Sequence, residues 1–457
     1  MLYKNAEIFT ENGFVSRAFA VEGGRFSEII PDYDGTADVD LNHAAVIPGL
    51  IDIHNHGNSG ADFSDGDYDG LVKMGRFLAE NGITSFAPAT MTLPYDVLAA
   101  AFATGVRLRD DRPAGCSRIV GINMEGPFFS EKKKGAQNAD YLKNPDFEAF
   151  RTLYEGCGGL IRLVDLAPEL PGAVAFTEKA KELCTVSIAH TDATYEEAKA
   201  VIDAGATHLT HLYNAMPGIH HRKPGVIGAG SENDGVVAEL ICDGLHIHPS
   251  AVRMAFRLFP GRICLISDAL RCTGMPDGVY PFGGQPLTLK NGEARMPDGA
   301  LAGSTATLYQ CMLNAISFGI YRDEAIRAST IIPAREVGCT MNSVPFQKGN
   351  WRTLSSAMLI PWPEEPSIRK EKKSPDASEF STLFPARKRH ALHGPEYLAF
   401  QIGVFRTHLG KQLFDFIPFA RLVLWTGVFD NRKIQISSQT ADLFFSSIDQ
   451  RAYLRYA

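Results

Sequence analysis

Between residue 46 and about residue 340, short apolar runs alternate with longer segments in which hydrophobic residues recur every three or four positions. The short runs predict buried strands, and the longer segments predict amphipathic helices. Eight strands are expected, over residues 50–54, 83–88, 119–124, 160–166, 185–189, 206–210, 236–242 and 263–267. Strands that alternate with helices in this way predict an α/β fold, a closed parallel (β/α)8 TIM-type barrel. An open doubly wound sheet is the alternative, but no glycine-rich dinucleotide turn follows the first strand.

The helical segments lie where a barrel needs them. The clearest are 68–81, 94–108, 173–183 and 195–204, and two more at 305–318 and 323–337 would complete the outer ring. A hairpin insertion is expected near 278–295, where Gly-Gly and Asn-Gly pairs mark turns. The barrel domain is therefore predicted to span 46–339.

The first 45 residues follow a different pattern. Short strands at 6–10, 18–21 and 26–30 are separated by Asn-Gly and Gly-Gly turn signals. This is too little chain to bury a core alone. Residues 1–45 are therefore predicted to form part of a small β-sandwich, which needs later strands to complete it.

Candidate chemistry appears at the end of the first barrel strand. Residues two apart on a strand point to the same side, so His54 and His56 should project together. Two converging imidazoles are suitable ligands for a zinc-like divalent metal. The simpler interpretation is a pair of polar residues in a turn, but more residues of the same kind follow at later strand ends.

In a (β/α)8 barrel the carboxyl ends of the strands form one rim, which is where active sites lie. The further polar residues expected at this rim are Glu125, His190, His211, Asp243, His246 and Asp268. A lone histidine is usually a core or loop residue. Together, however, these groups would be costly to bury unless a cation organised them. The sequence therefore predicts a metal centre at this rim.

Such a centre indicates a hydrolase. A bound divalent ion lowers the pKa of water from about 15.7 to about 7 and can polarise a carbonyl. A nearby carboxylate can take the proton from that water and return it to a leaving amine, and Asp268, the last of the set, suits this role. No Gly-x-Ser-x-Gly motif favours a serine nucleophile.

Charge and cysteine content limit the kinds of partner and compartment that the sequence suggests. The 457 residues carry a net charge of −7, which gives no reason to expect nucleic acid or an anionic membrane as partner. The N-terminal residues lack the apolar core of a signal peptide, and no run is long enough to span a membrane. The eight cysteines include no CxxC pair and are expected to be reduced thiols in a cytoplasmic protein.

The motifs resemble one known family. PGLIDIHNHG, NMEGPF, KGAQN, AHTDAT, THLYNAM, HRKPG, DGLH, ISDA and LAGS occur in the order found in N-acetylglucosamine-6-phosphate deacetylases of the amidohydrolase superfamily. The resemblance covers residues 1 to about 339. It implies hydrolysis of the acetamide of N-acetylglucosamine 6-phosphate, which gives glucosamine 6-phosphate and acetate in amino-sugar catabolism and cell-wall recycling.

The resemblance also implies roles for single residues. Glu125, His190 and His211 would bind the main metal, zinc or iron, His54 and His56 would serve a second ion that only some members bind, and Asp268 would be the catalytic acid and base. Of the implied substrate-binding residues, Asn214, Ala215, Arg222 and His246 would hold the sugar phosphate, and Leu301, Ala302 and Gly303 would line the acetyl end. Ala136 and Gln137 are further implied substrate-binding residues. Gln137 stands where many members have a histidine. Members are often homodimers that share phosphate contacts across the interface.

Two rival functions remain open. One is an amidohydrolase that acts on a cyclic amide, such as a dihydropyrimidine; that chemistry favours a lysine at a strand end, where this chain has Glu125. The other is no enzyme at all, but a sugar-phosphate binder or an inactive product of a damaged gene.

The resemblance ends abruptly after Cys339, and residues 340–457 are predicted to be an aberrant, poorly ordered tail. All three tryptophans lie in this tail, and all eight cysteines precede it. Reading from the third base of the Cys339 codon permits YDELGSISEGELADFVICDA, the segment expected in the family. The glutamate from Met341-Asn342 and the leucine from Asn350-Trp351 are forced by the genetic code. We therefore expect an out-of-frame tail and missing C-terminal strands in the small sandwich.

Overall fold

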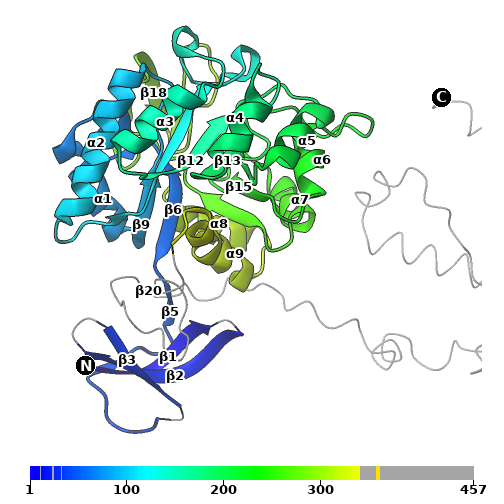
Figure 1. The fold of residues 1–457 in the computed structure, drawn as a ribbon. Coiled ribbons are helices and arrows are strands. Elements are labelled where there is room, and N and C mark those ends of the chain that lie inside the picture. Colours follow the sequence, from blue (N-terminus) through cyan, green and yellow to red (C-terminus); the bar gives the residue numbers. More distant parts are fainter. Residues whose placement is uncertain (11, 23–24, 32, 340–356, 361–457) are drawn as a thin grey trace, which may run out of the picture. The chain divides into compact units, whose positions relative to one another are not determined.

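Eight parallel strands form the centre of the computed structural model (Figure 1). The structure describes the chain except residues 11, 23–24, 32, 340–356 and 361–457. The barrel strands are β6 (Leu50–Asn55), β9 (Ile83–Pro88), β11 (Ile122–Phe128), β12 (Ile161–Leu166), β13 (Thr185–Ile188), β14 (His208–Leu209), β15 (Val237–Ile241) and β16 (Ile263–Ile266). Single bridges from Ala89 to Asn123 and from Asn55 to Ala269 close the ring. The predicted (β/α)8 barrel is confirmed.

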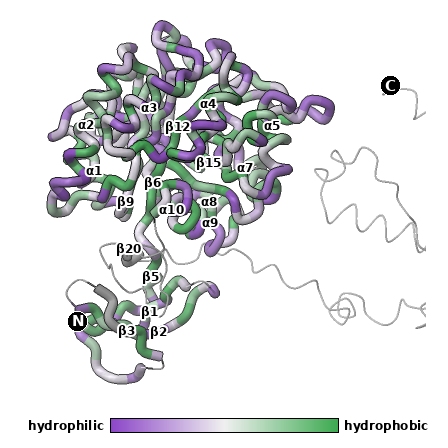
Figure 2. Tube along the Cα trace, in the orientation of Figure 1, coloured by the Kyte–Doolittle hydropathy of each residue, from purple (hydrophilic) through white to green (hydrophobic). Residues whose placement is uncertain are grey.

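Helices surround these strands (Figure 1). They are α1 (Tyr68–Glu80), α2 (Tyr95–Asp111), α3 (Phe147–Gly156), α4 (Ala173–Ala180), α5 (Tyr195–Ala204), α6 (Gly225–Ser231), α7 (Pro249–Leu258), α8 (Leu308–Ser317), α9 (Arg322–Ser329) and α10 (Ile331–Glu336). Side chains fix several starting points: Asp67 caps α1, and Thr194 forms a capping box with Glu197 on α5. Along these outer helices the tube in Figure 2 alternates between hydrophobic and hydrophilic residues, as helices against a buried barrel require.

One helical prediction was wrong in detail. The segment 323–337 is not one helix, because Thr330 leaves the helical region at φ −135° and ψ −71° and separates α9 from α10. The Thr330 hydroxyl donates a hydrogen bond to the carbonyl of Ile326 (2.6 Å), one turn earlier. This side-chain bond competes with regular helical geometry.

The N-terminal residues form a separate six-stranded sheet in the order β20-β5-β1-β2-β3, with β4 paired to β1. Its strands are β1 (Leu2–Thr10), β2 (Gly13–Glu22), β3 (Arg25–Ile30), β4 (Val39–Asp40), β5 (Ala45–Pro48) and β20 (Ala357–Ile360). We expected the C-terminal strands to be missing, yet β20 pairs antiparallel with β5, so four residues of the tail do join this sheet. The other expectations for residues 340–457 fall outside the described residues.

The predicted insertion is a three-stranded antiparallel sheet: β17 (Gly278–Phe282), β18 (Gln285–Lys290) and β19 (Glu293–Arg295). It has a small core of its own, in which Phe282 and Leu287 pack against Met91 and Ala302. The short elements are β7 (Gly57–Asn58), β8 (Ala61–Asp62), β10 (Arg118–Ile119) and the 3-10 helices η1 (Phe63–Asp65), η2 (Glu131–Lys133) and η3 (Ala139–Tyr141).

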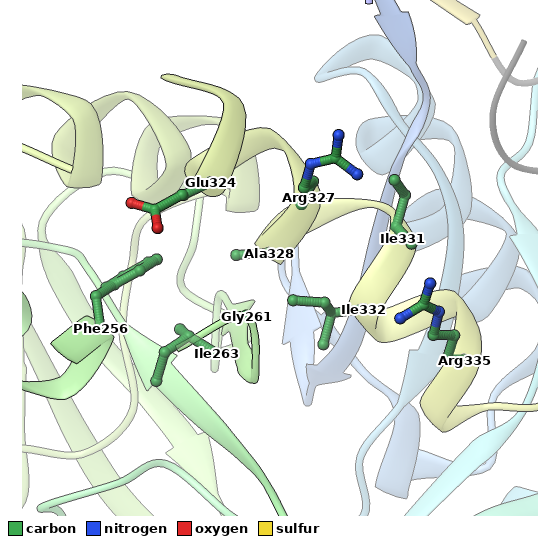
Figure 3. A pocket seen from close by; sticks show the side chains of 9 residues that line it. All are labelled: Phe256, Gly261, Ile263, Glu324, Arg327, Ala328, Ile331, Ile332 and Arg335. Atoms are coloured by element: carbon green, nitrogen blue, oxygen red, sulfur yellow. The ribbon is translucent and has the colours of Figure 1, made fainter. Parts of the chain in front are cut away.

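Three further observations bear on function. All eight cysteines are free thiols, as expected. No helix in the part of the chain that the structure describes combines the length and the hydrophobicity needed to cross a membrane. A small cavity opens between α7, the start of β16, α9 and α10, lined by Phe256, Ile263 and Ile332 among others (Figure 3). Ile263 begins β16, whereas the polar cluster follows the far end of that strand, so this cavity is not the predicted site.

Candidate active site

Three predicted ligands meet at the carboxyl end of the barrel. Glu125 lies in β11, and His190 and His211 follow β13 and β14. The Oε1 atom of Glu125 is 3.1 Å from His190 Nε2 and 3.3 Å from His211 Nε2, and the two ring nitrogens are 3.1 Å apart. All three side chains are buried. These atoms are close enough together for one metal ion to accept all three as ligands.

A second group shares Glu125. His54 lies near the end of β6 and His56 follows that strand, and their Nε2 atoms lie 3.6 and 3.3 Å from the carboxylate oxygens of Glu125. Asp268 Oδ1 lies 3.3 Å from His56 Nε2 and 3.8 Å from His54 Nε2. The sequence analysis placed all six residues at one rim, and the structure brings them together there.

Backbone strain concentrates at this cluster. His190, His211 and Asp268 have φ values of 44°, 30° and 49°, in the left-handed region that side chains with a Cβ rarely adopt. Each such residue costs about 1–3 kcal/mol and persists only where its surroundings hold it in place. Asp268, for example, is held by its amide, which donates to the His54 carbonyl (2.9 Å), and by its own carbonyl, which accepts from the Ser304 amide (2.7 Å).

Electrostatics couple the carboxylates to the imidazoles. Burial alone would raise the pKa of Glu125, but His54 and His56 outweigh it and hold that pKa well below its usual range. For His56 the effect of burial has the opposite sign: burial alone would lower the pKa, but Glu125 and Asp268 raise it to about 10. The cluster thus requires positive charge beside its carboxylates. The buried Nε2 of His54 has no hydrogen-bond partner among the described residues, which suits a metal ligand.

Gln137 belongs to the cluster although it is not a ligand type. Its Nε2 donates to Glu125 Oε2 (2.8 Å), and its Oε1 accepts from the Thr92 amide (2.8 Å). The Thr92 amide therefore fixes which end of the Gln137 amide faces Glu125. The neighbouring Ala136 is half-buried against the core of the insertion.

The predicted acetyl-end residues lie beside Asp268. A Cβ on Gly303 would stand only 2.5 Å from the Asp268 carbonyl oxygen and 2.7 Å from Asp268 Oδ1. Ala302 is buried and Leu301 is half-buried in the same segment. Glycine at 303 therefore lets the backbone approach the Asp268 side chain closely.

The predicted phosphate-end residues are more dispersed. Asn214 donates to the carbonyl of His211 (3.3 Å), and the Ala215 carbonyl accepts from the Thr191 amide (3.0 Å). His246 Nδ1 is 2.7 Å from Asp243 Oδ2. Arg222 is exposed and contacts the neighbouring His221, and within the described residues no hydrogen bond or ion pair joins it to the cluster.

Comparison with known proteins identifies the fold and site together. Residues 45–277 match the model of the amidohydrolase family. The N-acetylglucosamine-6-phosphate deacetylase of Vibrio furnissii is 35% identical over 346 residues, which cover 75% of this chain and 84% of that protein. The chain belongs to the N-acetylglucosamine-6-phosphate deacetylases. The N-acetylgalactosamine-6-phosphate deacetylase of Escherichia coli O157:H7 is also 35% identical, over 64% of this chain and 78% of that protein.

A solved structure agrees with this assignment. A mutant N-acetyl-D-glucosamine-6-phosphate deacetylase from Mycobacterium smegmatis, in complex with N-acetyl-D-glucosamine-6-phosphate, has a TM-score of 0.70 at 31% identity, covering 74% of this chain and 90% of that chain. The predicted membership of the deacetylase family is confirmed. Amidohydrolases depend on metal, and this chain has two groups of residues able to hold one.

The sequence analysis missed Glu239, which lies in β15 and is fully buried. Its Oε2 is 3.0 Å from His54 Nδ1 and accepts the His211 amide (3.1 Å). One signal could have found it: a carboxylate inside the apolar run VVAELIC must either face solvent or have a buried partner. The sequence analysis also missed two other buried polar residues. Asp52 accepts a hydrogen bond from the Ser267 hydroxyl, and His208 lies in β14.

Proposed function

We propose that this chain hydrolyses the acetamide of N-acetylglucosamine 6-phosphate and releases glucosamine 6-phosphate and acetate, a step of amino-sugar catabolism and cell-wall recycling. The observation that carries the proposal is the convergence of Glu125, His190, His211 and Asp268 at the active-site rim of a deacetylase-family barrel. The rival cyclic-amide chemistry loses support because the curated relatives at 35% identity are sugar-phosphate deacetylases.

Glu125, His190 and His211 would hold the principal metal ion, zinc or iron. His54 and His56 would hold a second ion together with Glu125, so the site has room for one or two. Their buried nitrogen and oxygen atoms form a mixed imidazole–carboxylate donor set, which both metals accept. A bound ion would supply an acidified water and a polarised acetyl carbonyl.

Asp268 would be the catalytic acid and base. Burial raises the pKa of this carboxyl, but His56 and His54 outweigh burial and lower it, so the side chain is ionised and able to accept a proton. It would take a proton from the attacking water and deliver it to the leaving amine as the C–N bond breaks.

The sugar phosphate would be held by residues around the rim. Asn214, Ala215 and His246 would contact it from the loops after β14 and β15, and Arg222 would supply a planar fork for the phosphate. Because Arg222 is exposed and away from the cluster, this role suits a homodimer in which a second copy completes the site. Leu301, Ala302 and Gly303 would line the acetyl end. Ala136 and Gln137 would also contact the substrate, and the Gln137 amide can hydrogen-bond a sugar hydroxyl.

Acetate release is the direct test. The full chain, treated with a chelator and then reloaded with zinc or iron, is assayed on N-acetylglucosamine 6-phosphate beside a version with the reading frame restored after Cys339. We expect metal-dependent release of acetate in the restored protein. Acetate release that ignores metal, or none from the restored protein, would contradict the proposal.

One relative suggests a second substrate to include in the assay. Because an N-acetylgalactosamine-6-phosphate deacetylase is also 35% identical, over 64% of this chain, the C4 epimer of the substrate is included in the assay. We expect a higher kcat/KM for N-acetylglucosamine 6-phosphate. The opposite ranking would reassign the sugar while leaving the metal chemistry unchanged.

A further inference from the structure

A line of buried charged side chains runs through the barrel away from the metal-binding cluster. It begins at His54, continues through Glu239 in β15 and His208 in β14, and ends at Glu336, the last residue of α10. The side chains of the first three are fully buried, and Glu336 is 14% exposed. Burying a charged group away from water costs free energy, so such groups are usually paired with an opposite charge or a hydrogen-bond partner.

Each contact along this line is short. His54 Nδ1 is 3.0 Å from Glu239 Oε2, the other oxygen of Glu239 is 3.2 Å from His208 Nε2, and His208 Nδ1 is 2.7 Å from Glu336 Oε2. Both ring nitrogens of His208 thus face carboxylates. His208 Nδ1 is hydrogen-bonded to Glu336, and its Nε2 lies within ion-pair distance of Glu239 without hydrogen-bond geometry, so a protonated His208 would compensate the buried charge of Glu239.

Glu239 contacts one residue of each of the two proposed metal-ligand groups, His54 and His211. The same Oε2 that faces the His54 ring accepts the backbone amide of His211 at 3.1 Å. An ionised carboxylate at His54 Nδ1 places the ring proton on Nδ1 and leaves the Nε2 lone pair directed at the cluster, where Nε2 is 3.6 Å from Glu125. The amide contact holds His211, whose backbone lies in the strained left-handed region.

We propose that Glu239 is a positioning residue for the metal site, and that the His208–Glu336 pair holds Glu239 and so ties the end of α10 to that site. The link reaches the opposite end of the barrel, because the Thr185 hydroxyl at the start of β13 donates to the Glu336 carbonyl (3.0 Å). The family-like sequence ends shortly after Glu336. A change in the packing of α10 would therefore act on the proposed metal ligand His54 through His208 and Glu239.

The test measures metal affinity without substrate. Full-length chain and the variants Glu239→Gln, His208→Gln and Glu336→Gln are stripped of metal and titrated with zinc against a chromophoric chelator. Loss of a group that orients a ligand typically weakens metal affinity by about 10–100-fold. We expect that loss for Glu239→Gln, and smaller losses in the same direction for His208→Gln and Glu336→Gln.

Asp165→Asn is the matched control. Asp165 is a fully buried carboxyl group in β12, bonded to Thr210 (3.0 Å) rather than to a proposed ligand. Its substitution alters another buried carboxyl group of the barrel interior and leaves the contact between Glu239 and His54 in place, so we expect zinc affinity within about threefold of the parent chain. An equal loss in Asp165→Asn and Glu239→Gln would overturn the proposal, because it would assign the effect to the loss of any buried carboxyl group.

A second readout covers variants that fold poorly. Proton and ring-nitrogen NMR shifts of the metal-free chain, with His54 assigned through His54→Asn, report how strongly its Nδ1–H is hydrogen-bonded. We expect a strong hydrogen bond from His54 Nδ1–H in the parent and in the mild Glu336→Gln variant, and a weaker one in Glu239→Gln. Unchanged His54 shifts and unchanged zinc affinity in Glu239→Gln would overturn the proposal. The proposal rests on the proposed metal role of His54, but neither readout needs deacetylation, so failure of one is distinguishable from failure of the other.

Discussion

Gly303→Ala is a sharp test of how Asp268 is held. The added Cβ would lie 2.5 Å from the Asp268 carbonyl oxygen and 2.7 Å from Oδ1, whereas an ordinary contact begins at 3.4 Å. Asp268 must therefore move by about 0.7–0.9 Å, or the 301–304 segment must retreat by the same amount. Overpacking of this kind costs about 1–3 kcal/mol of stability.

The effect on catalysis should be larger than the effect on stability. A misplacement of about 1 Å at a reacting group can cost roughly 100-fold in rate. We expect kcat to fall by about that factor on N-acetylglucosamine 6-phosphate in the frame-restored protein, with zinc content unchanged, because the three atoms nearest to the added Cβ all belong to Asp268.

The assay pairs steady-state acetate release with elemental analysis of zinc. Gly156→Ala, at the end of α3, is the control, because a Cβ there meets nothing within 4 Å. We expect the control to keep full activity and melt at or slightly above the parent temperature. Undiminished kcat in Gly303→Ala would refute the argument that Asp268 and Gly303 form one tightly packed unit.

Three further predictions follow from the same geometry. Asp268→Asn should lower kcat by about 10²–10⁴-fold with zinc retained, and wild-type activity in this variant would exclude Asp268 as the acid and base. Burial raises the pKa of Asp165 to about 8, so the folded chain holds this proton more tightly than the unfolded chain does. The free energy of unfolding therefore falls as pH rises from about 4 through 8. In metal-free protein Asp165→Asn should remove part of that fall, and identical pH–stability curves of variant and parent would contradict the assignment. Sequencing the encoding DNA around the Cys339 codon should reveal a second frame that encodes an LGSISEG-like segment, and a frame without one would make the tail genuine.

The barrel was predictable because its strands are mostly apolar. A run such as 263–267 can only be buried, and eight predominantly apolar runs separated by helices leave few arrangements. The site was predictable for the same reason: parallel strands place their carboxyl ends at one rim, so His54 and His190, far apart in sequence, had to meet. The prediction needed no side-chain detail.

What escaped prediction depends on contacts between distant segments. Glu239 stands in an apolar run, and nothing in the run shows that its partner is His54, 185 residues earlier. The break at Thr330 comes from one hydroxyl that bonds back to Ile326. The pairing of β20 with β5 could not be predicted either, because the tail carries no family motif to indicate it.

The central claim is that a divalent ion sits between Glu125, His190 and His211 and activates water for Asp268. Anomalous diffraction at the zinc edge, from crystals of the frame-restored protein, tests this most directly. The account predicts a peak bonded to Glu125 Oε1 and to Nε2 of both histidines at about 2.0–2.2 Å, with Asp268 nearby. Zinc-replete crystals with no peak at these three atoms would contradict the account.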